Sequence, residues 1–332
     1  MIAQLDADYL EASPWKGVTR VLSWLAFEGR PVTTRGRWIN PLVFRFLDLA
    51  RRLPAGRDLE PPILIVGTGR SGTTILGKVL SLHPEVGFLN EPKALWHAAY
   101  PAEDVIGNYT RGAARYRLEA EDAGEETADA VRRMYGTYLS LVRASRVLDK
   151  FPEMIFRVPF VRRIFPGATF LFLVRDGWDT VRSIDRWSDR LGDETGEHTH
   201  DWWGVDDRKW RLLVRDVVAE DPSLREDIEV IEGLDDHRDR AAVEWIVTMR
   251  EGMKWLRRLP GAFHLLRYED LVREPRDALS DLLAACGLTQ SETVLRYAEG
   301  RLRSRPHKPP CDLHPAVAGA FRETMHEMGY RR

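Results

Sequence analysis

Residues 62–74 have the sequence Pro-Ile-Leu-Ile-Val-Gly-Thr-Gly-Arg-Ser-Gly-Thr-Thr, in which an apolar strand runs directly into a glycine-rich turn. Gly67 and Gly72 have the spacing of the phosphate-binding sequence G-x-x-x-x-G-K-[ST]. Thr73 stands at the lysine position, and the loop carries its cation as Arg70 instead. Backbone N–H groups of such a loop, together with the N-terminus of the following helix, hold a phosphate whatever the side chains are. The segment therefore predicts a phosphate-binding loop. Because the lysine is replaced, the group attached to the phosphate is expected to react differently from the γ-phosphate of ATP.

Composition and charge narrow the class of protein. The chain has 332 residues, of which 44% are hydrophobic, and this is enough for one α/β domain with a sizeable core. A net charge of −2 argues against a general nucleic-acid binder, so we predict no nucleic-acid partner. Cys286 and Cys311 are too few for a disulfide framework or a tetrahedral zinc site.

The cellular location is predicted from the same features. No apolar run approaches the roughly 20 residues that a spanning helix needs. The N-terminus carries Asp6, Asp8 and Glu11 where a secretion signal has basic residues. Together with the low cysteine count, this predicts a cytoplasmic protein.

Strand and helix patterns alternate along the chain. Strands are predicted at residues 63–66, 86–89, 146–149, 168–174 and 263–266, and helices at 75–82 and 128–145. This order predicts an α/β fold of the P-loop type, with a doubly wound, mostly parallel sheet flanked by helices. Ligands of such sheets bind at the carboxyl ends of the strands. The segments expected to meet there begin at Gly67, Asn90, Lys150, Arg175 and Tyr268.

Two regions lie outside this alternation. Residues 1–58 are predicted to be an amphipathic helical extension, and residues 59–332 the phosphate-binding domain. The extension either packs on the core or forms a peripheral membrane or partner surface. Residues 186–240 are an acidic, loop-rich insertion that contains Trp187, Trp202, Trp203 and Trp210. The insertion is interpreted as a lid or ligand-binding region, or as a small core of its own.

A second phosphate site is suggested by residues 170–183, Phe-Leu-Phe-Leu-Val-Arg-Asp-Gly-Trp-Asp-Thr-Val-Arg-Ser. Arg175 ends a predicted strand, and Ser183 lies about two turns into the next helix. An arginine and a hydroxyl fixed in this way can bind a phosphate separate from the one on the loop. The alternative is a structural ion pair of Arg175 with Asp176 or Asp179.

Several motifs together resemble a known family. They are Gly69-Arg-Ser-Gly-Thr-Thr74, His83-Pro-Glu-Val86, Asn90-Glu-Pro92, Asp149-Lys150, Leu173-Val-Arg-Asp-Gly with Ser183, and Arg267-Tyr-Glu-Asp-Leu271. In this order they resemble the sulfotransferases that use 3′-phosphoadenosine 5′-phosphosulfate (PAPS). The likeness is greatest to the branch with the tyrosylprotein and Golgi carbohydrate enzymes and bacterial relatives. It covers roughly residues 62–185 and 262–330.

The resemblance implies where the donor binds. The loop that holds the 5′-phosphosulfate corresponds to Gly69, Arg70, Ser71, Gly72, Thr73 and Thr74. Within it, Arg70 matches the basic residue beside the bridging oxygen. Arg175 and Ser183 match the pair that holds the 3′-phosphate. Lys150 matches a lysine that neutralises the sulfonate and the leaving oxygen, although it could also be a solvated strand-end lysine.

Glu91 is the candidate general base. It follows the second predicted strand, and in the similar branch a glutamate at this place accepts the proton of the acceptor hydroxyl. The alternative is an acid that favours a helix start before Pro92. The phenol and steroid sulfotransferases use a histidine, but none follows Lys150, so His97 is only a minor alternative.

Two further segments are implied to contact the nucleotide. Tyr268 is predicted to contact the adenosine, with plain packing as the alternative. The C-terminal cations Arg305 and Lys308 match a basic loop that closes over the 3′-phosphate in relatives. Because their spacing departs from the known forms, a solvated basic loop stays an alternative.

Taken together, these motifs are interpreted as a sulfotransferase that moves sulfonate from PAPS to an acceptor hydroxyl without a metal and leaves adenosine 3′,5′-bisphosphate (PAP). The acceptor is expected to be a carbohydrate or glycolipid, then a small-molecule alcohol or phenol, and a protein tyrosine third. The alternatives are a P-loop kinase that uses ATP, or a nucleotide-binding module without turnover. The sequence does not predict the oligomeric state.

Overall fold

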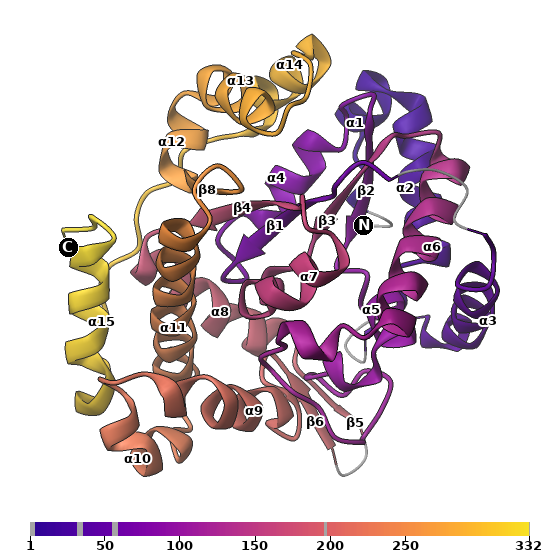
Figure 1. Cartoon of the computed structure of the whole chain (residues 1–332). Coiled ribbons are helices and arrows are strands. Elements are labelled where there is room, and N and C mark those ends of the chain that lie inside the picture. Colours follow the sequence, from indigo (N-terminus) through magenta and orange to yellow (C-terminus); the bar gives the residue numbers. More distant parts are fainter. Residues whose placement is uncertain (1–3, 32–35, 55–58, 196–197, 332) are drawn as a thin grey trace.

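The fold is built on one parallel sheet (Figure 1). The computed structural model describes residues 4–31, 36–54, 59–195 and 198–331. Five strands lie in the order β2-β3-β1-β4-β8, and every neighbouring pair is parallel. They are β1 (Ile63–Gly67), β2 (Val86–Asn90), β3 (Arg146–Lys150), β4 (Thr169–Val174) and β8 (Phe263–Arg267). The predicted doubly wound α/β sheet is confirmed, with each strand within a residue or two of its predicted position.

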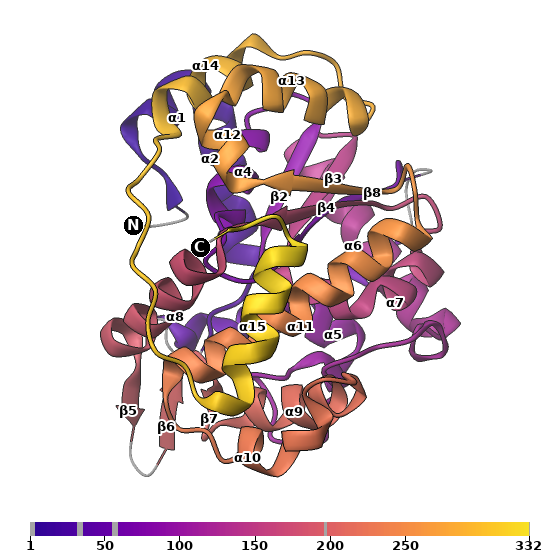
Figure 2. The ribbon, with the colours of Figure 1, turned by 90° about the vertical axis from the view of Figure 1, so that its left-hand side faces the viewer.

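Helices cover both faces of the sheet (Figure 2). Those that connect or flank the strands are α4 (Thr73–Leu80), α5 (Lys93–Ala99), α6 (Glu125–Val142), α7 (Val158–Ile164), α8 (Gly177–Leu191), α11 (His237–Arg258), α12 (Tyr268–Arg273), α13 (Pro275–Ala285), α14 (Glu292–Arg301) and α15 (Pro315–Glu327). Helix α15 packs along α11, which itself packs on α8. Within the described residues, every helix is too short or too polar to cross a membrane.

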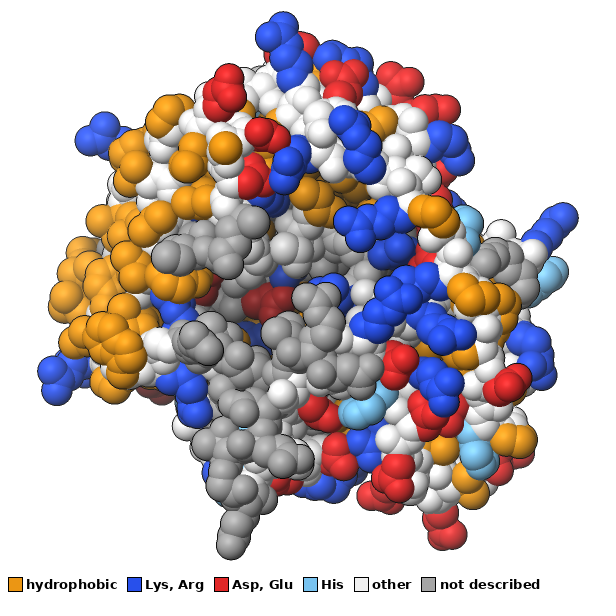
Figure 3. Space-filling model, turned by 180° about the vertical axis from the view of Figure 1, so that it is seen from behind, with side chains coloured by type: hydrophobic (Ala, Val, Ile, Leu, Met, Phe, Trp, Pro, Cys, Tyr) orange, Lys and Arg blue, Asp and Glu red, His pale blue; other side chains and the backbone are white. Residues whose placement is uncertain are grey.

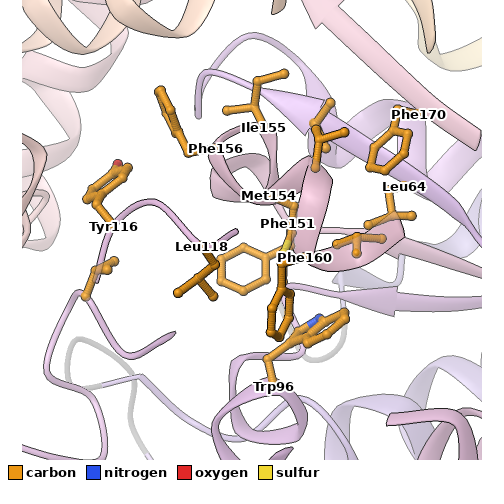
Figure 4. Packing of buried hydrophobic residues seen from close by; sticks show 14 of the residues in the cluster. Leu64, Trp96, Tyr116, Leu118, Phe151, Met154, Ile155, Phe156, Phe160 and Phe170 are labelled. Carbon is orange, nitrogen blue, oxygen red and sulfur yellow. The ribbon is translucent and has the colours of Figure 1, made fainter. Parts of the chain in front are cut away.

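The strands are apolar throughout because each face of the sheet has its own core. Ile63 and Ile65 pack with α4, α13 and α14 on one face. Leu64 and Val66 belong to the larger core on the other face. Figure 4 shows part of this core, where Leu64 and Phe170 of the sheet lie near side chains from residues 151–160. Successive residues of one strand thus stabilise opposite layers.

The N-terminal helices form a layer against the edge strand β2. They are α1 (Ala7–Ala12), α2 (Pro14–Ala26) and α3 (Asn40–Ala50). Lys16 of α2 donates hydrogen bonds to the carbonyl oxygens of Pro84 and Val86 at 3.2 and 2.7 Å. Arg20 reaches the carbonyl oxygen of Phe88 at 3.2 Å. The segment predicted as an extension therefore packs on the sheet as an integral layer, although residues 1–3, 32–35 and 55–58 lie outside the described part.

The insertion at residues 186–240 is more regular than predicted. Helix α8 continues through Leu191 and is followed by a three-stranded antiparallel sheet and two further helices. These elements are β5 (Asp193–Thr195), β6 (His198–Asp201), β7 (Gly204–Val205), α9 (Arg208–Asp216) and α10 (Ile228–Glu232). The expectation of a loop-rich stretch is wrong because Trp203, Trp210 and Leu213 are buried in the main core and order the segment.

Candidate active site

The glycine-rich turn between β1 and α4 has a backbone that only glycine adopts easily. Gly67 has φ +139°, and a Cβ there would lie 2.6 Å from the carbonyl oxygen of Leu173. Gly72 has φ +103°, and its Cβ would lie 2.5 Å from the Tyr268 ring. Ser71 closes the turn by donating its hydroxyl to the carbonyl oxygen of Thr68 at 2.6 Å. The chain thus enters α4 in a conformation that leaves the first N–H groups of that helix outside its own hydrogen bonding.

Three predicted donor-binding residues meet beside this turn. Arg70 Nε donates to Ser183 Oγ at 3.3 Å, which joins the loop to α8. Arg175 Nη1 donates to the carbonyl oxygen of Arg70 at 3.4 Å. The Arg175 guanidinium also lies 4.5 Å from the centre of the Tyr268 ring. Arg70, Arg175 and Ser183 therefore lie together, with the Tyr268 ring beside Arg175. That Arg175 and Ser183 bind a second phosphate stays a prediction.

Arg175 also forms an ion pair with Asp179, which was the alternative predicted from the sequence. Its Nη2 atom lies 3.5 Å from Asp179 Oδ2. Its Nε atom is buried and has no hydrogen-bond partner within the described residues. A buried donor without a partner is costly unless another group accepts its hydrogen bond. The ion pair therefore accounts for only one edge of this guanidinium.

Residues 302–314, which connect α14 to α15 and are called the C-terminal strap, bring Lys308 close to Arg70 and Arg175. Its backbone N–H donates to Asp179 Oδ1 at 2.7 Å, and its Nζ donates to the carbonyl oxygen of Asp179 at 3.2 Å. Burial, followed by the charges of Arg186, Arg175 and Arg70, lowers the pKa of Lys308 to about 8. Arg305 is exposed and makes no hydrogen bond or ion pair with the described residues, so its predicted contact stays a prediction.

Glu91 and Lys150 meet at the carboxyl ends of β2 and β3. The Glu91 N–H donates to the Lys150 carbonyl oxygen at 2.7 Å, and Lys150 Nζ donates to Glu91 Oε1. Glu91 has φ +49°, an uncommon conformation for a glutamate, and such strain gathers at functional sites. Lys150 is 1% exposed, whereas the Glu91 side chain is 36% exposed. The Glu91 side chain is therefore partly exposed, whereas the ammonium group with which it pairs is buried.

The charge of Glu91 is set by its surroundings. Burial alone raises its pKa, but the ammonium groups of Lys150 and Lys93 hold the pKa below its ordinary value. Lys93 Nζ lies 3.4 Å from Glu91 Oε2 and 3.7 Å from Glu153 Oε1. Glu91 is therefore ionised at neutral pH. Its place at the N-terminal side of α5 also fits the alternative of a helix-start acid.

Sequence reasoning missed a second set of charges close to this pair. Lys209 donates to Glu244 Oε1 at 2.6 Å, and both side chains are buried. Burial raises the pKa of Glu153, but the charges of Lys93 and, to a smaller extent, Lys209 outweigh burial and lower the pKa overall. Lys209 therefore acts on the same carboxylate as Lys93. Lys93 stands two residues after Glu91, and this spacing was the only signal in the sequence for any of these residues.

Trp202 of the insertion packs directly against the glycine-rich turn. A Cβ on Gly69 would lie 2.4 Å from the Trp202 ring. The Trp202 indole N–H donates to Glu244 Oε2 at 2.6 Å, and Lys209 Nζ lies 4.6 Å from the ring centre. Trp187 meets the same ring edge to face, with 5.2 Å between the ring centres. The insertion thus reaches the phosphate loop through one aromatic side chain.

The face of the molecule seen in Figure 3 has a hollow. Acidic and basic side chains lie at its floor, and Lys and Arg side chains gather along one rim. The site thus combines the Glu91–Lys150 pair at the strand ends with the cations Arg70 and Arg175 beside the glycine-rich turn.

The histidines have other places. His97 packs against the rings of Phe44 and Tyr109, with centres 5.7 and 5.2 Å away. Its pKa is lowered by burial. His83 lies in the turn before β2, where its Nε2 is 2.9 Å from the carbonyl oxygen of Thr289. Nothing in these contacts favours His97 over Glu91 as the base.

Within the described residues, one cluster has the side-chain spacing of a metal site. Single ligand atoms of Asp176, Asp179 and His307 lie within 4.8 Å of one another. Asp176 accepts the Asp179 N–H as the N-cap of α8. Asp179 is bound by Arg175, His307 and Lys308. These partners account for the cluster as the structural link between α8 and the C-terminal strap.

Comparisons with known proteins identify the family of this chain. The model of the sulfotransferase family matches residues 61–203 and 209–292, which include the loop, Glu91, Lys150 and Arg175. The chain belongs to the sulfotransferase family. The match ends before the C-terminal strap with Arg305 and Lys308, and it does not include helices α1–α3.

Curated relatives of this sulfotransferase are similar over a limited stretch. The protein-tyrosine sulfotransferase of Drosophila melanogaster is 30% identical over 130 residues, which is 37% of this chain and 25% of the relative. Protein-tyrosine sulfotransferase A of Caenorhabditis elegans is 27% identical over 131 residues, 38% of this chain and 33% of the relative. The chain thus spans a quarter to a third of the length of these relatives.

A solved structure supports the fold of this sulfotransferase over nearly its whole length. A sulfotransferase from Mycobacterium avium is 13% identical, with a TM-score of 0.50, and the match covers 98% of this chain and 96% of that chain. At this identity the match concerns the fold alone. It includes the elements of the insertion and the N-terminal layer in its coverage.

Proposed function

We propose that this sulfotransferase moves the sulfonate of PAPS to the hydroxyl of an acceptor and releases PAP and a sulfate ester. The observation that carries the proposal is the cationic group of Arg70, Arg175 and Lys308 beside the glycine-rich loop. A nucleotide with phosphate at both its 5′ and 3′ positions needs two anion sites, and this arrangement offers them side by side.

The donor would lie with its 5′-phosphosulfate on the loop of residues 69–74. The N–H groups at the start of α4 suit this phosphate by geometry and by the helix dipole. Arg175 and Ser183 would hold the 3′-phosphate, and Lys308 would approach it from the C-terminal strap. Tyr268, against which Arg175 packs, is placed to contact the adenosine. Arg305 lies on the same strap and is retained as a proposed contact.

In the transfer step, the acceptor oxygen forms a bond to sulfur while the bond from sulfur to the bridging oxygen of the phosphate breaks. The acceptor proton passes to the Glu91 carboxylate, and the electron pair of the broken bond stays on the leaving phosphate. Lys150 and Arg70 stabilise this growing charge. Because in-line positioning and charge stabilisation supply the rate in such transfers, these three side chains suffice for the chemistry that we propose.

The ion pair of Glu91 with Lys150 also gives the order of events in this proposal. While paired, Glu91 is ionised but weakly basic, because both ammonium groups favour its charge. As charge develops on the leaving phosphate, Lys150 interacts with that oxygen instead, and the proton affinity of Glu91 rises. A base matched to its task in this way contributes about 10²–10⁴-fold to the rate.

For the acceptor, we propose a carbohydrate or glycolipid hydroxyl first and a small-molecule alcohol or phenol second. Trp202, half-buried beside Gly69 and held by the buried Glu244 and Lys209, offers an aromatic face, which suits a sugar. The named protein-tyrosine relatives support a tyrosine hydroxyl as the third choice.

The test is calorimetric titration with PAP, and with ATP plus magnesium, of the wild type, Arg175→Ala and the exposed control Arg225→Ala. We expect PAP to bind with chelator present, Arg175→Ala to weaken it by about tenfold to a hundredfold, and Arg225→Ala to leave it unchanged. Preference for ATP with magnesium would instead indicate a kinase. Binding that ignores Arg175 would contradict the proposed 3′-phosphate site.

Turnover is tested separately from binding. Transfer of labelled sulfonate from PAPS to a panel of sugars, glycolipids, phenols and tyrosine peptides identifies the acceptor class. Tight PAP binding with no transfer to any class, and with no slow hydrolysis of PAPS, would indicate a binding module without turnover.

A further inference from the structure

Helix α2 turns its polar side inward. Lys16, Arg20 and Ser23 are buried. Lys16 and Arg20 donate hydrogen bonds to carbonyl oxygens of Val86 and Phe88, and the Ser23 hydroxyl lies 2.8 Å from the Tyr138 hydroxyl. On the opposite side, Trp15 and Val18 are 47% and 58% exposed. A helix on a globular core normally buries its apolar stripe and exposes its polar one. The orientation of α2 therefore leaves an apolar stripe without a partner among the described residues.

Helix α3 and the turn before it continue this stripe. Trp38 is 79% exposed, and Leu42 and Leu49 are each 56% exposed. We call the combined surface the α2–α3 apolar face, and its residues are Trp15, Val18, Leu25, Trp38, Leu42, Leu49 and Leu53. Within the described residues, the other large hydrophobic side chains of comparable exposure are Leu10, which packs on α2 at Gly17, Leu141 and Val230. In Figure 3 hydrophobic side chains gather on one side of the molecule, beside the hollow.

The charges around the α2–α3 apolar face are mostly positive. Residues 36–54 contain four arginines and one acidic residue, Asp48. Asp48 is already paired with Arg51 and Arg52, at 2.6 and 2.8 Å. Arg143, at the end of α6, lies 5.7 Å from the centre of the Trp15 ring and adds a further cation. An apolar face that holds tryptophans and is bordered by arginines has the composition of a helix surface that binds an anionic bilayer.

We propose that the α2–α3 apolar face docks on the surface of an anionic lipid membrane. Trp15 and Trp38 would enter the interface, where indole rings partition well. Arg45 lies on α3 with Leu42 and Leu49, and Arg52 follows the end of this helix. Both arginines would contact the lipid headgroups. A second copy of the chain is a poorer occupant, because a two-fold contact of this face with itself sets its arginines against one another.

Docking would place the active site next to the bilayer, and this consequence rests on the function proposed above. Helix α2 leads into Glu28, whose Oε1 accepts the backbone N–H of Asn90 at 2.9 Å. Asn90 immediately precedes the candidate base Glu91. A membrane-anchored hydroxyl, such as that of a glycolipid, would then reach the site without leaving its bilayer. The docking itself needs no catalysis and is tested without it.

The experiment is co-sedimentation of the full chain with vesicles of phosphatidylcholine, alone or mixed with phosphatidylglycerol. We expect binding to the mixed vesicles that high salt weakens. Trp38→Ser with Leu42→Ser should lower the partition coefficient about tenfold or more, since two exposed apolar groups no longer enter the bilayer. Arg45→Glu with Arg52→Glu should lower it about tenfold on anionic vesicles only.

The matched control is Val230→Ser with Arg225→Glu, which changes the same kinds of exposed side chain on another part of the surface. It should bind vesicles like the wild type. Thermal unfolding and PAP titration of each variant verify that fold and donor site are intact, so a failure of the proposed activity is distinguishable from a failure of docking. Absence of vesicle binding, or concentration-dependent dimerisation that Trp38→Ser with Leu42→Ser abolishes, would overturn the proposal.

Discussion

Glu91 and Lys150 are joined twice, once through their side chains and once through the Glu91 N–H and the Lys150 carbonyl oxygen at 2.7 Å. The register of the sheet explains this, because Asn90 of β2 is the parallel partner of Lys150 of β3. The base and the cation of the proposed reaction are therefore held by neighbouring strands of the sheet. Sites supported by such elements keep their geometry better than sites on loops.

Replacing the proposed base should separate binding from chemistry. Glu91→Gln should slow sulfonate transfer by about 10²–10⁴-fold, because the amide accepts no proton from the attacking hydroxyl. Single-turnover transfer from labelled PAPS measures this rate. PAP affinity should change little, and the exposed control Glu226→Gln should transfer at the wild-type rate. Unchanged transfer by Glu91→Gln would leave Glu91 as a helix-start acid only.

The pKa of Lys308 predicts how PAP affinity depends on pH. This lysine is protonated below about pH 8 and loses its charge as the pH rises further. A bound phosphate favours the protonated form, so above pH 8 binding must take up a proton, and affinity should fall by up to about tenfold per pH unit. Titrations between about pH 7 and pH 9 should show this fall in the wild type and a smaller one in Lys308→Met. Equal slopes in both proteins would exclude Lys308 from the phosphate site.

The contact of Trp202 with Gly69 predicts energetic coupling. Gly69→Ala should lower the free energy of unfolding by about 1–3 kcal/mol, because its Cβ overlaps the indole ring. In combination with Trp202→Ala, which removes the ring, the loss should be smaller than the sum of the two single losses by about 1 kcal/mol. Urea unfolding measures these values. Gly124→Ala, whose Cβ would have no atom within 4 Å, supplies the control pair with Trp202→Ala, which should be additive.

A buried ion pair predicts that the N-terminal layer supports the whole domain. Arg20 donates to Glu28 through both terminal nitrogens, at 2.5 and 3.2 Å, and both side chains are about 5% exposed or less. Arg20→Met leaves the Glu28 carboxylate buried without its cation and should cost about 3–5 kcal/mol in the free energy of unfolding. Urea unfolding of Arg20→Met and of Arg225→Met compares a buried with an exposed arginine. Equal, small losses would show that α2 is an appendage.

The sequence predicted those parts of the site that follow from strand ends. An apolar strand followed by glycines located the loop, and the parallel order implied that Arg70, Arg175 and Ser183 would meet, as they do. Contacts that depend on distant segments were not predictable in this way. Lys209 and Glu244 are 35 residues apart on different helices, and nothing in either segment specifies the other.

Amphipathic spacing has a related limit. It predicted amphipathic helices within residues 1–58 but not the side of α2 that faces the protein. Lys16 and Arg20 face inward because the edge of β2 offers them carbonyl oxygens, which the helix sequence alone does not reveal.

The inward polar side of α2 has a consequence for the free edge of the sheet. Strand β2 is an edge strand. On its outer side, the carbonyl oxygens of Val86 and Phe88 accept from Lys16 and Arg20, and the Asn90 N–H donates to Glu28. Unpaired strand edges are templates for pairing with other chains. Helix α2 therefore covers this edge and opposes amyloid-like addition of another strand. A chain truncated before β1 would expose the edge and should aggregate.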